Sequence, residues 1–270
     1  MNHQINGDSE AFRGDIVIAE IYNKISSSCS NLTERSEDSL TGYFFGCMRY
    51  IPFDKGLKNI LLDCIRPKEL TQYIEPIKVV EWADKIEFWK RVKVEDRNTE
   101  LDVCLDFEDL LLGVEVKYLS GLSSEDEVDN SNGNEQISYN QLSREARALS
   151  QIGKDKNKLL ILLADELSCF KIYQSVQRRN IINGVELGYI SWQEILIALK
   201  KIKNFNTYEQ VIVNDMILLL EKKGFNRFEN FATDVIVDKS NSWAFGGQVN
   251  IKFDFRILRP VGKGEYYEFG

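Results

Sequence analysis

Two carboxylates and a lysine near the middle of the chain could form a cation-dependent hydrolytic site. Asp102 lies in residues 100–106, and Glu115 and Lys117 lie in residues 112–118; both stretches alternate apolar with polar side chains. This period of two predicts two β-strands, each with its polar side chains on one face. Carboxylate oxygens bind hard divalent cations, and a nearby ammonium group can stabilise negative charge that develops on a substrate.

The short connection 107–111 predicts that the two strands form a hairpin. If the turn is centred on Glu108 and Asp109, Asp102 lies directly opposite Glu115. The Cβ atoms of such neighbours lie about 4.5 to 5.5 Å apart, so two ionised carboxylates would repel each other unless a cation lies between them. We expect that cation to be Mg²⁺, which takes one or two protein carboxylates and keeps waters or phosphate oxygens as its other ligands. Mn²⁺ could replace it.

The same alternation predicts which side chains of the hairpin enter the core. The expected core residues are Leu101, Val103 and Leu105 on the first strand and Val114, Val116 and Tyr118 on the second. Asp102, Glu115 and Lys117 then share the opposite face. There Lys117 could orient an attacking water or stabilise negative charge on a phosphorus centre.

Further strands and helices are expected on both sides of this hairpin. Helical spacing of apolar residues indicates helices at 33–50 and 136–151, and apolar or β-branched runs indicate strands at 86–94, 159–164 and 188–190. The expected fold class is therefore α/β, with a central mixed β-sheet flanked by α-helices.

Capping signals mark two later helices. A hydroxyl followed three residues later by a carboxylate or amide forms a capping box, which fits two pairs: Ser191 with Glu194, and Thr207 with Gln210. Gly224 is expected to end the second helix. Residues 120–135, rich in Ser, Asn, Gly and acidic side chains, predict a loop. Residues 249–257 alternate and predict a strand whose place in the fold the sequence does not fix.

The chain resembles the PD-(D/E)XK nuclease superfamily at residues 100–102 (Glu-Leu-Asp) and 113–117 (Gly-Val-Glu-Val-Lys). In that superfamily an Asp and a Glu-x-Lys lie on adjacent strands, and Leu101 stands here in place of the superfamily's Pro. The resemblance implies a restriction-endonuclease-like fold. It spans roughly residues 34–225.

Two helices extend the resemblance beyond the hairpin. Residues 36–50 (Ser-Glu-Asp-Ser-Leu-Thr-Gly-Tyr-Phe-Phe-Gly-Cys-Met-Arg-Tyr) are similar to the first helix of several of these families, whose acidic residue completes the site; the matching residue is Glu37. Residues 140–142 (Asn-Gln-Leu) are similar to the glutamine motif of the exonuclease-like branches, which assigns Gln141. A later helix pair at 190–199 and 215–225 is also typical of such families.

The resemblance implies a magnesium-dependent nuclease that hydrolyses DNA phosphodiester bonds. Asp102, Glu115 and the carbonyl of Val116 would hold Mg²⁺, Glu37 would support the metal or its water, and Lys117 would stabilise the developing charge. The products would carry 5′-phosphate and 3′-hydroxyl ends. Restriction or phage defence is an expected setting, RNA is a second possible substrate, and a homodimer with two sites would suit cleavage of both strands.

Plainer interpretations compete at each of these positions. Charged residues that alternate on a hairpin often form only a solvated face. Glu37, like Glu34 and Asp38, could simply favour the helix N-terminus through the helix dipole, and Gln141 could be an ordinary surface residue. The whole protein could instead be a nuclease-like module without catalysis that binds nucleic acid or protein, or a structural subunit of a larger complex.

Composition excludes several other classes of enzyme. The only histidine is His3, which argues against Ser-His-Asp triads, Cys-His pairs and histidine-ligated zinc. The five cysteines, at 29, 47, 64, 104 and 169, are odd in number and form no Cys-x-x-Cys pair, which argues against a disulfide framework or structural zinc. No phosphate-binding loop of the Gly-x-x-x-x-Gly-Lys type is present. We expect a cytoplasmic protein with no signal peptide and no membrane partner, because no apolar run is long enough to span a bilayer.

The net charge of −8 is unfavourable for non-specific binding to nucleic acid. A local basic face could still bind phosphates. Its expected members are Lys154, Lys156, Lys158, Arg178, Arg179, Lys200, Lys201 and Lys203. Such binding would be moderate and sensitive to salt.

The length of 270 residues, 43% of them hydrophobic, is sufficient for one substantial core with a small extension. We expect a nuclease-like domain at 1–225. Residues 226–270 would form a β-containing extension packed on the same domain.

Overall fold

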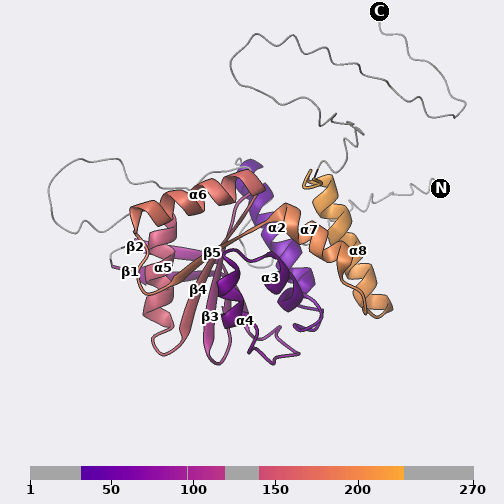
Figure 1. Ribbon diagram of the computed structural model, residues 1–270, viewed down its shortest axis with the longest axis horizontal. Helices are drawn as coiled ribbons and strands as arrows, with labels where there is room; N and C mark the ends of the chain where they lie inside the picture. Colours follow the sequence, from indigo (N-terminus) through magenta and orange to yellow (C-terminus); the bar gives the residue numbers. More distant parts are fainter. Residues whose placement is uncertain (1–31, 96, 119–139, 228–270) are drawn as a thin grey trace, which may run out of the picture. The chain divides into compact units, whose positions relative to one another are not determined.

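A computed structural model describes residues 32–95, 97–118 and 140–227 (Figure 1). Within them lies one five-stranded sheet in the order β1-β2-β3-β4-β5. The strands are β1 (Ile86–Val94), β2 (Arg97–Asp106), β3 (Leu110–Val116), β4 (Asn157–Ala164) and β5 (Glu186–Ser191). The first three strands pair antiparallel, whereas β3, β4 and β5 pair parallel. The sheet is therefore mixed, and the predicted α/β class is confirmed at that level.

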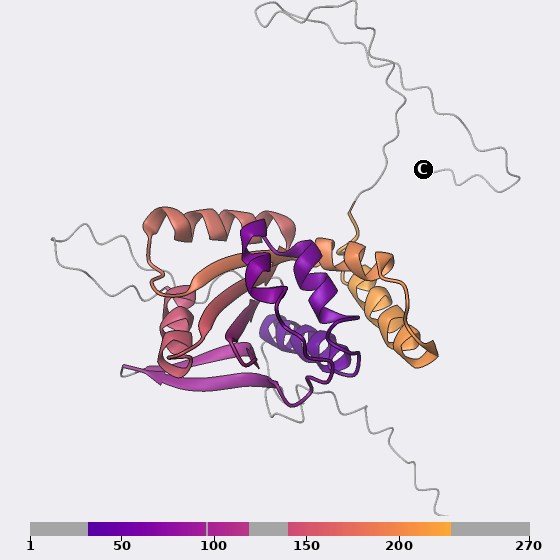
Figure 2. The same ribbon diagram turned by 60° about the horizontal axis from the view of Figure 1, so that its bottom comes forward.

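Helices cover both faces of the sheet (Figure 2). The α-helices are α2 (Leu32–Met48), α3 (Leu57–Cys64), α4 (Thr71–Ile74), α5 (Gln141–Ile152), α6 (Glu166–Arg179), α7 (Trp192–Lys201) and α8 (Thr207–Lys222), and η1 (Lys68–Leu70) is a 3₁₀ turn. One buried cluster joins the sheet to α2, α3, α7 and α8. A second cluster joins the opposite face to α5 and α6.

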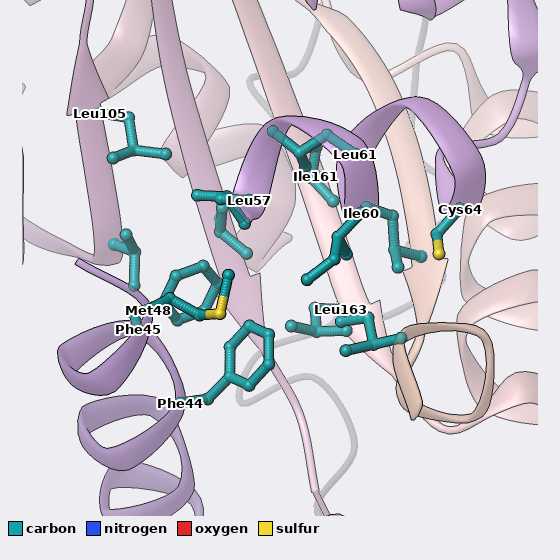
Figure 3. Close-up of a cluster of buried hydrophobic side chains, with 14 of the residues drawn as sticks. Phe44, Phe45, Met48, Leu57, Ile60, Leu61, Cys64, Leu105, Ile161 and Leu163 are labelled. Carbon is teal, nitrogen blue, oxygen red and sulfur yellow. The ribbon is translucent and has the colours of Figure 1, made fainter. Parts of the chain in front are cut away.

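The first cluster is the larger part of the core (Figure 3). Figure 3 shows side chains from α2, α3 and the sheet that meet between the layers: Phe44, Phe45 and Met48; Leu57, Ile60, Leu61 and Cys64; Leu105, Ile161 and Leu163. Every residue of β3 is buried, as expected for a strand covered by helices on both faces. Each aliphatic side chain of this kind contributes about 1.5 to 3 kcal/mol by leaving water.

The hairpin of β2 and β3 has the predicted register. The paired residues are Val103 with Val114, Cys104 with Gly113, Leu105 with Leu112 and Asp106 with Leu111. The turn is centred on Glu108 and Asp109, and the Phe107 N–H donates to the Leu110 carbonyl across it at 2.9 Å. The next pair in the same register, beyond Val103 and Val114, would be Asp102 with Glu115.

The predicted alternation on β2 fails at Leu101. Val103 and Leu105 belong to the first cluster as expected, but Leu101 belongs to the second, with α5. On the neighbouring strand, Trp89 has a φ of 49°, in the left-handed region that a bulky residue seldom adopts within a strand, and both Phe88 and Trp89 face the first cluster. The pairing of β1 with β2 is interrupted at this residue, between the pairs Phe88–Val103 and Lys90–Leu101. The far half of the β1–β2 ribbon packs on α5.

Most other predicted elements are confirmed, but one helix cap is shifted and helices α3, α4 and α6 were not predicted. Helix α8 is capped by Asn206, whose side chain accepts the Tyr208 and Glu209 N–H groups, while the Glu209 side chain accepts the Asn206 N–H. The predicted box of Thr207 with Gln210 is therefore wrong by one residue. Helix α6 was not predicted at all, although Asp165 caps its first turn.

Several predictions lie outside the described residues. They concern the loop at 120–135, the helix start at 136–139, the strand at 249–257 and the extension beyond 227. The domain boundary at 225 therefore stays a prediction. Among the described residues, no helix combines the length and the apolar character that a membrane crossing requires.

Replacing Leu163 with Ala should lower the free energy of unfolding by about 2 to 5 kcal/mol, because the deletion leaves a cavity between α3 and β4. Leu218→Ala is the control, because Leu218 is 62% exposed, and it should change the stability by less than about 0.5 kcal/mol. Urea unfolding followed by circular dichroism measures both values. Equal losses in the two variants would contradict the assigned core.

Candidate active site

Asp102 and Glu115 lie where β2 and β3 stop pairing. The half-buried Asp102 accepts the backbone N–H of Val116 through Oδ2 at 2.9 Å, and Glu115 is 1% exposed. The N–H and C=O groups of one strand residue point to the same neighbouring strand. The Val116 carbonyl therefore lies on the side of Asp102, and the two carboxylates and this carbonyl approach one another from adjacent strands.

Lys117 follows the end of β3 and lies between two carboxylates. Its ammonium nitrogen is 2.6 Å from Glu115 Oε1 and 3.2 Å from Glu37 Oε1, and only 6% of the residue is exposed. Its backbone is fixed as well: the Lys117 N–H donates to Leu163 at 2.7 Å, and the buried indole of Trp192 donates to the Lys117 carbonyl at 3.0 Å. The lysine is thus held at both its backbone and its charged end.

Glu37 connects α2 to the end of β3. One carboxylate oxygen contacts Lys117, and the other accepts the backbone N–H of Tyr118 at 2.9 Å. Of the acidic residues at the start of this helix, Glu37 is shown to contact Lys117.

Helix α5 adds two more polar side chains. Gln141, its first residue, donates an amide hydrogen to Glu115 Oε1 at 2.5 Å. Glu145 lies one turn further on the same helical face, is 1% exposed and interacts with Glu115. Sequence reasoning missed Glu145. Its spacing of four residues from Gln141 is the signal that could have found it.

Three buried carboxylate oxygens receive no hydrogen bond from the described residues. They are Oε2 of Glu115 and both side-chain oxygens of Glu145. The donors that reach Glu115, from Lys117 and Gln141, both use Oε1. Burial of acceptors without donors is unfavourable, so this side of Glu115 requires a positive group or a proton.

Burial, together with the excess of carboxylates over ammonium groups, raises the pKa values of the acidic residues in this site. Burial raises the pKa of Asp102 well above its usual value, and the charge of Glu115 raises it further against the opposing effect of Lys117. Burial also raises the pKa of Glu115, again with a carboxylate neighbour, Glu145, in the same direction. Burial and the nearby Asp102 raise the pKa of Glu145 to about 8, although contacts with Glu115, Lys117 and Gln141 lower it in part.

The pKa of Lys117 is raised although its ammonium group is buried. Burial alone would lower the pKa of its ammonium group, but Glu115, Glu37 and Asp102 together outweigh that effect and raise it. The side chain is therefore an ammonium ion at neutral pH. It can donate hydrogen bonds and stabilise negative charge, but it is unsuited to accept a proton.

The site meets the minimal requirements of a magnesium ion. In the described part of the chain, no group of three or more His, Cys, Asp and Glu side chains is arranged to hold a metal ion. Magnesium needs only one or two protein carboxylates, however, and completes its octahedron with water or phosphate oxygens. Asp102, Glu115 and the Val116 carbonyl supply such a set, and the Glu115 oxygen without a donor is an acceptor available to a cation.

Comparisons with known proteins add little to this geometry. No family model matches the chain, and no solved structure matches it. A phenylalanine–tRNA ligase beta subunit of Mycoplasmopsis pulmonis (strain UAB CTIP) is 32% identical over 117 residues, which cover 41% of this chain and 15% of that protein. The chain thus matches only a small part of that protein's length, which does not show a family.

The structure brings together all five side chains that the sequence singled out, namely Glu37, Asp102, Glu115, Lys117 and Gln141. The structure gives the positions of these side chains, whereas their roles stay predictions. Two groups of residues from the predicted basic face lie away from this site. Residues 154–158 precede or begin β4, and Arg178 and Arg179 end α6, which returns along β4 and β5. These groups lie at the edge where the parallel strands begin, opposite the edge that carries Lys117.

The pKa values predict a pH dependence of stability in the presence of chelator. A carboxyl group whose pKa is higher in the folded than in the unfolded state stabilises the fold below its unfolded value, and that contribution is lost as the pH rises through the folded value. For Glu145 this window runs from about pH 4.5 to about pH 8. The free energy of unfolding should fall across it by up to about 1.4 kcal/mol per pH unit, and Asp102 and Glu115 act in the same direction.

Glu145→Gln should reduce this slope, because the amide does not titrate. The control is Glu95→Gln, which removes an exposed carboxylate that pairs with Arg147 near the same helix. Urea unfolding at several pH values measures the slope for each protein. The same slope in wild type and Glu145→Gln would contradict the high pKa of this carboxyl.

Proposed function

We propose that this protein is a magnesium-dependent nuclease with a restriction-endonuclease-like fold, which hydrolyses DNA phosphodiester bonds. The observation that carries the proposal is the convergence of Asp102, Glu115 and Lys117 at the ends of two adjacent antiparallel strands. The resemblance of residues 100–102 and 113–117 to the PD-(D/E)XK signature supports it.

Asp102, Glu115 and the Val116 carbonyl would hold the Mg²⁺ ion, and Mn²⁺ could replace it. When bound, the ion supplies Lewis acidity and orients a phosphoryl group and a water molecule. Asp102 is held for this task by the Val116 N–H, and Glu115 by the amide of Gln141. These hydrogen bonds fix the carboxylates before a substrate arrives, which reduces the reorganisation that the reaction requires.

Lys117 would stabilise the negative charge that develops on the phosphoryl oxygens during in-line attack by water. The surrounding carboxylates keep Lys117 protonated. Its ion pairs with Glu37 and Glu115 hold the ammonium group in place. Glu37 acts through Lys117 in this scheme and is a positioning residue. The oxygen of the broken P–O bond leaves on the 3′ side as a hydroxyl, and the phosphate stays on the 5′ end.

We expect two cationic side chains to contact phosphates that flank the scissile bond. Arg144 lies in the first turn of α5, next to Gln141 and Glu145. The ammonium group of Lys223 lies 4.6 Å from the centre of the ring of Tyr118, the residue that follows Lys117 in the chain. Burial lowers the pKa of Lys223. Such local charges can attract a phosphate backbone to a protein whose net charge is negative.

Supercoiled plasmid incubated with the full chain should be cut in Mg²⁺ or Mn²⁺ and stay intact in chelator. Asp102→Asn, which keeps the shape but removes the charge, should reduce cleavage by roughly 10²-fold or more. The matched control is Asp106→Asn on the same strand, because Asp106 is exposed and pairs only with Lys156 among the described residues. End-labelling before and after phosphatase treatment checks for 5′-phosphates.

Undiminished cleavage by Asp102→Asn would exclude the proposed site. The alternative, a nuclease-like module without catalysis, predicts no cleavage and no calorimetric signal for Mn²⁺ that depends on Asp102 or Glu115. The same assay with labelled single-stranded RNA distinguishes the two nucleic-acid substrates.

A further inference from the structure

The backbone on both sides of the Lys117 side chain is bonded to three different elements. The Lys117 N–H donates to the Leu163 carbonyl of β4 at 2.7 Å. The Lys117 carbonyl accepts the indole N–H of Trp192, the first residue of α7, at 3.0 Å. The Tyr118 N–H donates to Glu37 of α2 at 2.9 Å. The indole is thus the one side-chain donor that reaches the Lys117 carbonyl from the helical layer.

Trp192 is itself held in one orientation by two aromatic rings. It is fully buried, with the Phe44 ring edge-on at 5.3 Å between ring centres and the Phe225 ring stacked at 5.6 Å. Aromatic pairs at such separations attract each other beyond the effect of burial alone. The rings come from α2 and from the turn after α8, so the packing of three helices fixes the direction of the indole N–H.

Helix α2 reaches Lys117 by two routes. Glu37 contacts the ammonium group directly at 3.2 Å. Phe44 lies seven residues further along the same helical face and contacts Trp192, which holds the Lys117 carbonyl. The position of one helix is therefore transmitted to both the charged end and the backbone of the lysine.

We propose that Trp192 is a positioning residue, whose indole holds the Lys117 carbonyl so that the ammonium group stays between Glu37 and Glu115. The lysine side chain is a flexible four-carbon stem, so its charged end is placed only as well as its backbone is. The effect on cleavage rests on the proposed function, in which Lys117 stabilises developing charge. A misplacement of about 1 Å at such a group can cost roughly 10²-fold in rate.

Trp192→Phe tests this role, because it keeps an aromatic ring and removes the N–H donor. The matched control is Trp82→Phe. Trp82 is 1% exposed, and its indole donates to the Ile51 carbonyl at 2.8 Å, just after the end of α2, whereas Glu37 lies near the start of that helix. Both variants lose one buried hydrogen bond of the same type, so both should show similar decreases in melting temperature.

The two variants should differ in plasmid cleavage. We expect kcat to fall by roughly 10- to 100-fold in Trp192→Phe, because Lys117 is no longer held where charge develops. KM should stay within about twofold of wild type, because the lost interaction acts in the transition state. Trp82→Phe should keep both values of wild type.

A second readout needs no cleavage. In protein labelled with ¹⁵N-lysine, nuclear magnetic resonance measures how fast the ammonium hydrogens of Lys117 exchange with water, and Lys117→Arg assigns the signal by removing it. Exchange should be several-fold faster in Trp192→Phe than in wild type and unchanged in Trp82→Phe. Phe225→Leu removes the ring stacked on Trp192 but keeps the indole, and should change the exchange rate in the same direction. This variant serves the same test if Trp192→Phe does not fold.

The outcomes separate this inference from the proposed function. Exchange of the Lys117 ammonium at the wild-type rate in Trp192→Phe and Phe225→Leu overturns the positioning role, whatever happens to cleavage. Equal effects of Trp192→Phe and Trp82→Phe also overturn it, because lost stability alone then explains both. A wild-type chain that cuts no DNA overturns the proposed function, while faster exchange confined to the Trp192 and Phe225 variants still supports the positioning of Lys117.

Discussion

The contact of the Lys117 ammonium with Glu115 and Glu37 is the interaction on which the rest of the site depends. It joins the end of β3 to α2 and lies beside α5, so three elements meet at one buried charge. Without this ammonium group, several carboxylates would be buried with no positive partner among the described residues, at a cost of several kcal/mol. The backbone of Lys117 is held equally firmly, by Leu163 and by the indole of Trp192.

The scaffold places this contact at the edge of a rigid sheet. Strand β3 is buried along its whole length and has paired strands on both sides, so Glu115 starts from a fixed backbone position. The β1–β2 pairing is interrupted at Trp89 and Asp102, the β2–β3 pairing ends at Val103 and Val114, and the Asp102 carboxylate accepts the Val116 N–H. A strand that stays regular would satisfy this N–H with a backbone carbonyl, and the aspartate would lack its fixed orientation.

Local patterns predicted the hairpin well but failed where packing between distant elements decides the outcome. The turn at Glu108 and Asp109 fixes the register of β2 and β3, because the ladder continues from it pair by pair. The assignment of Leu101 failed because alternation assumes a regular strand, and the irregular residue lies on the neighbouring strand. The cap of α8 shifted to Asn206 because two adjacent residues can both cap a helix, and only the packed structure selects between them.

The sequence by itself determined that Asp102 and Glu115 lie on adjacent strands, with Lys117 two residues further, because side-chain alternation and a short turn are local properties of the chain. Only the tertiary structure decided that Glu37, which is 80 residues away in the chain, contacts Lys117, and that Glu145 lies against Glu115. Those contacts depend on how α2 and α5 pack on the sheet. Apolar side chains determine that packing without regard to where the acidic residues fall, so the local pattern of charges could not reveal it.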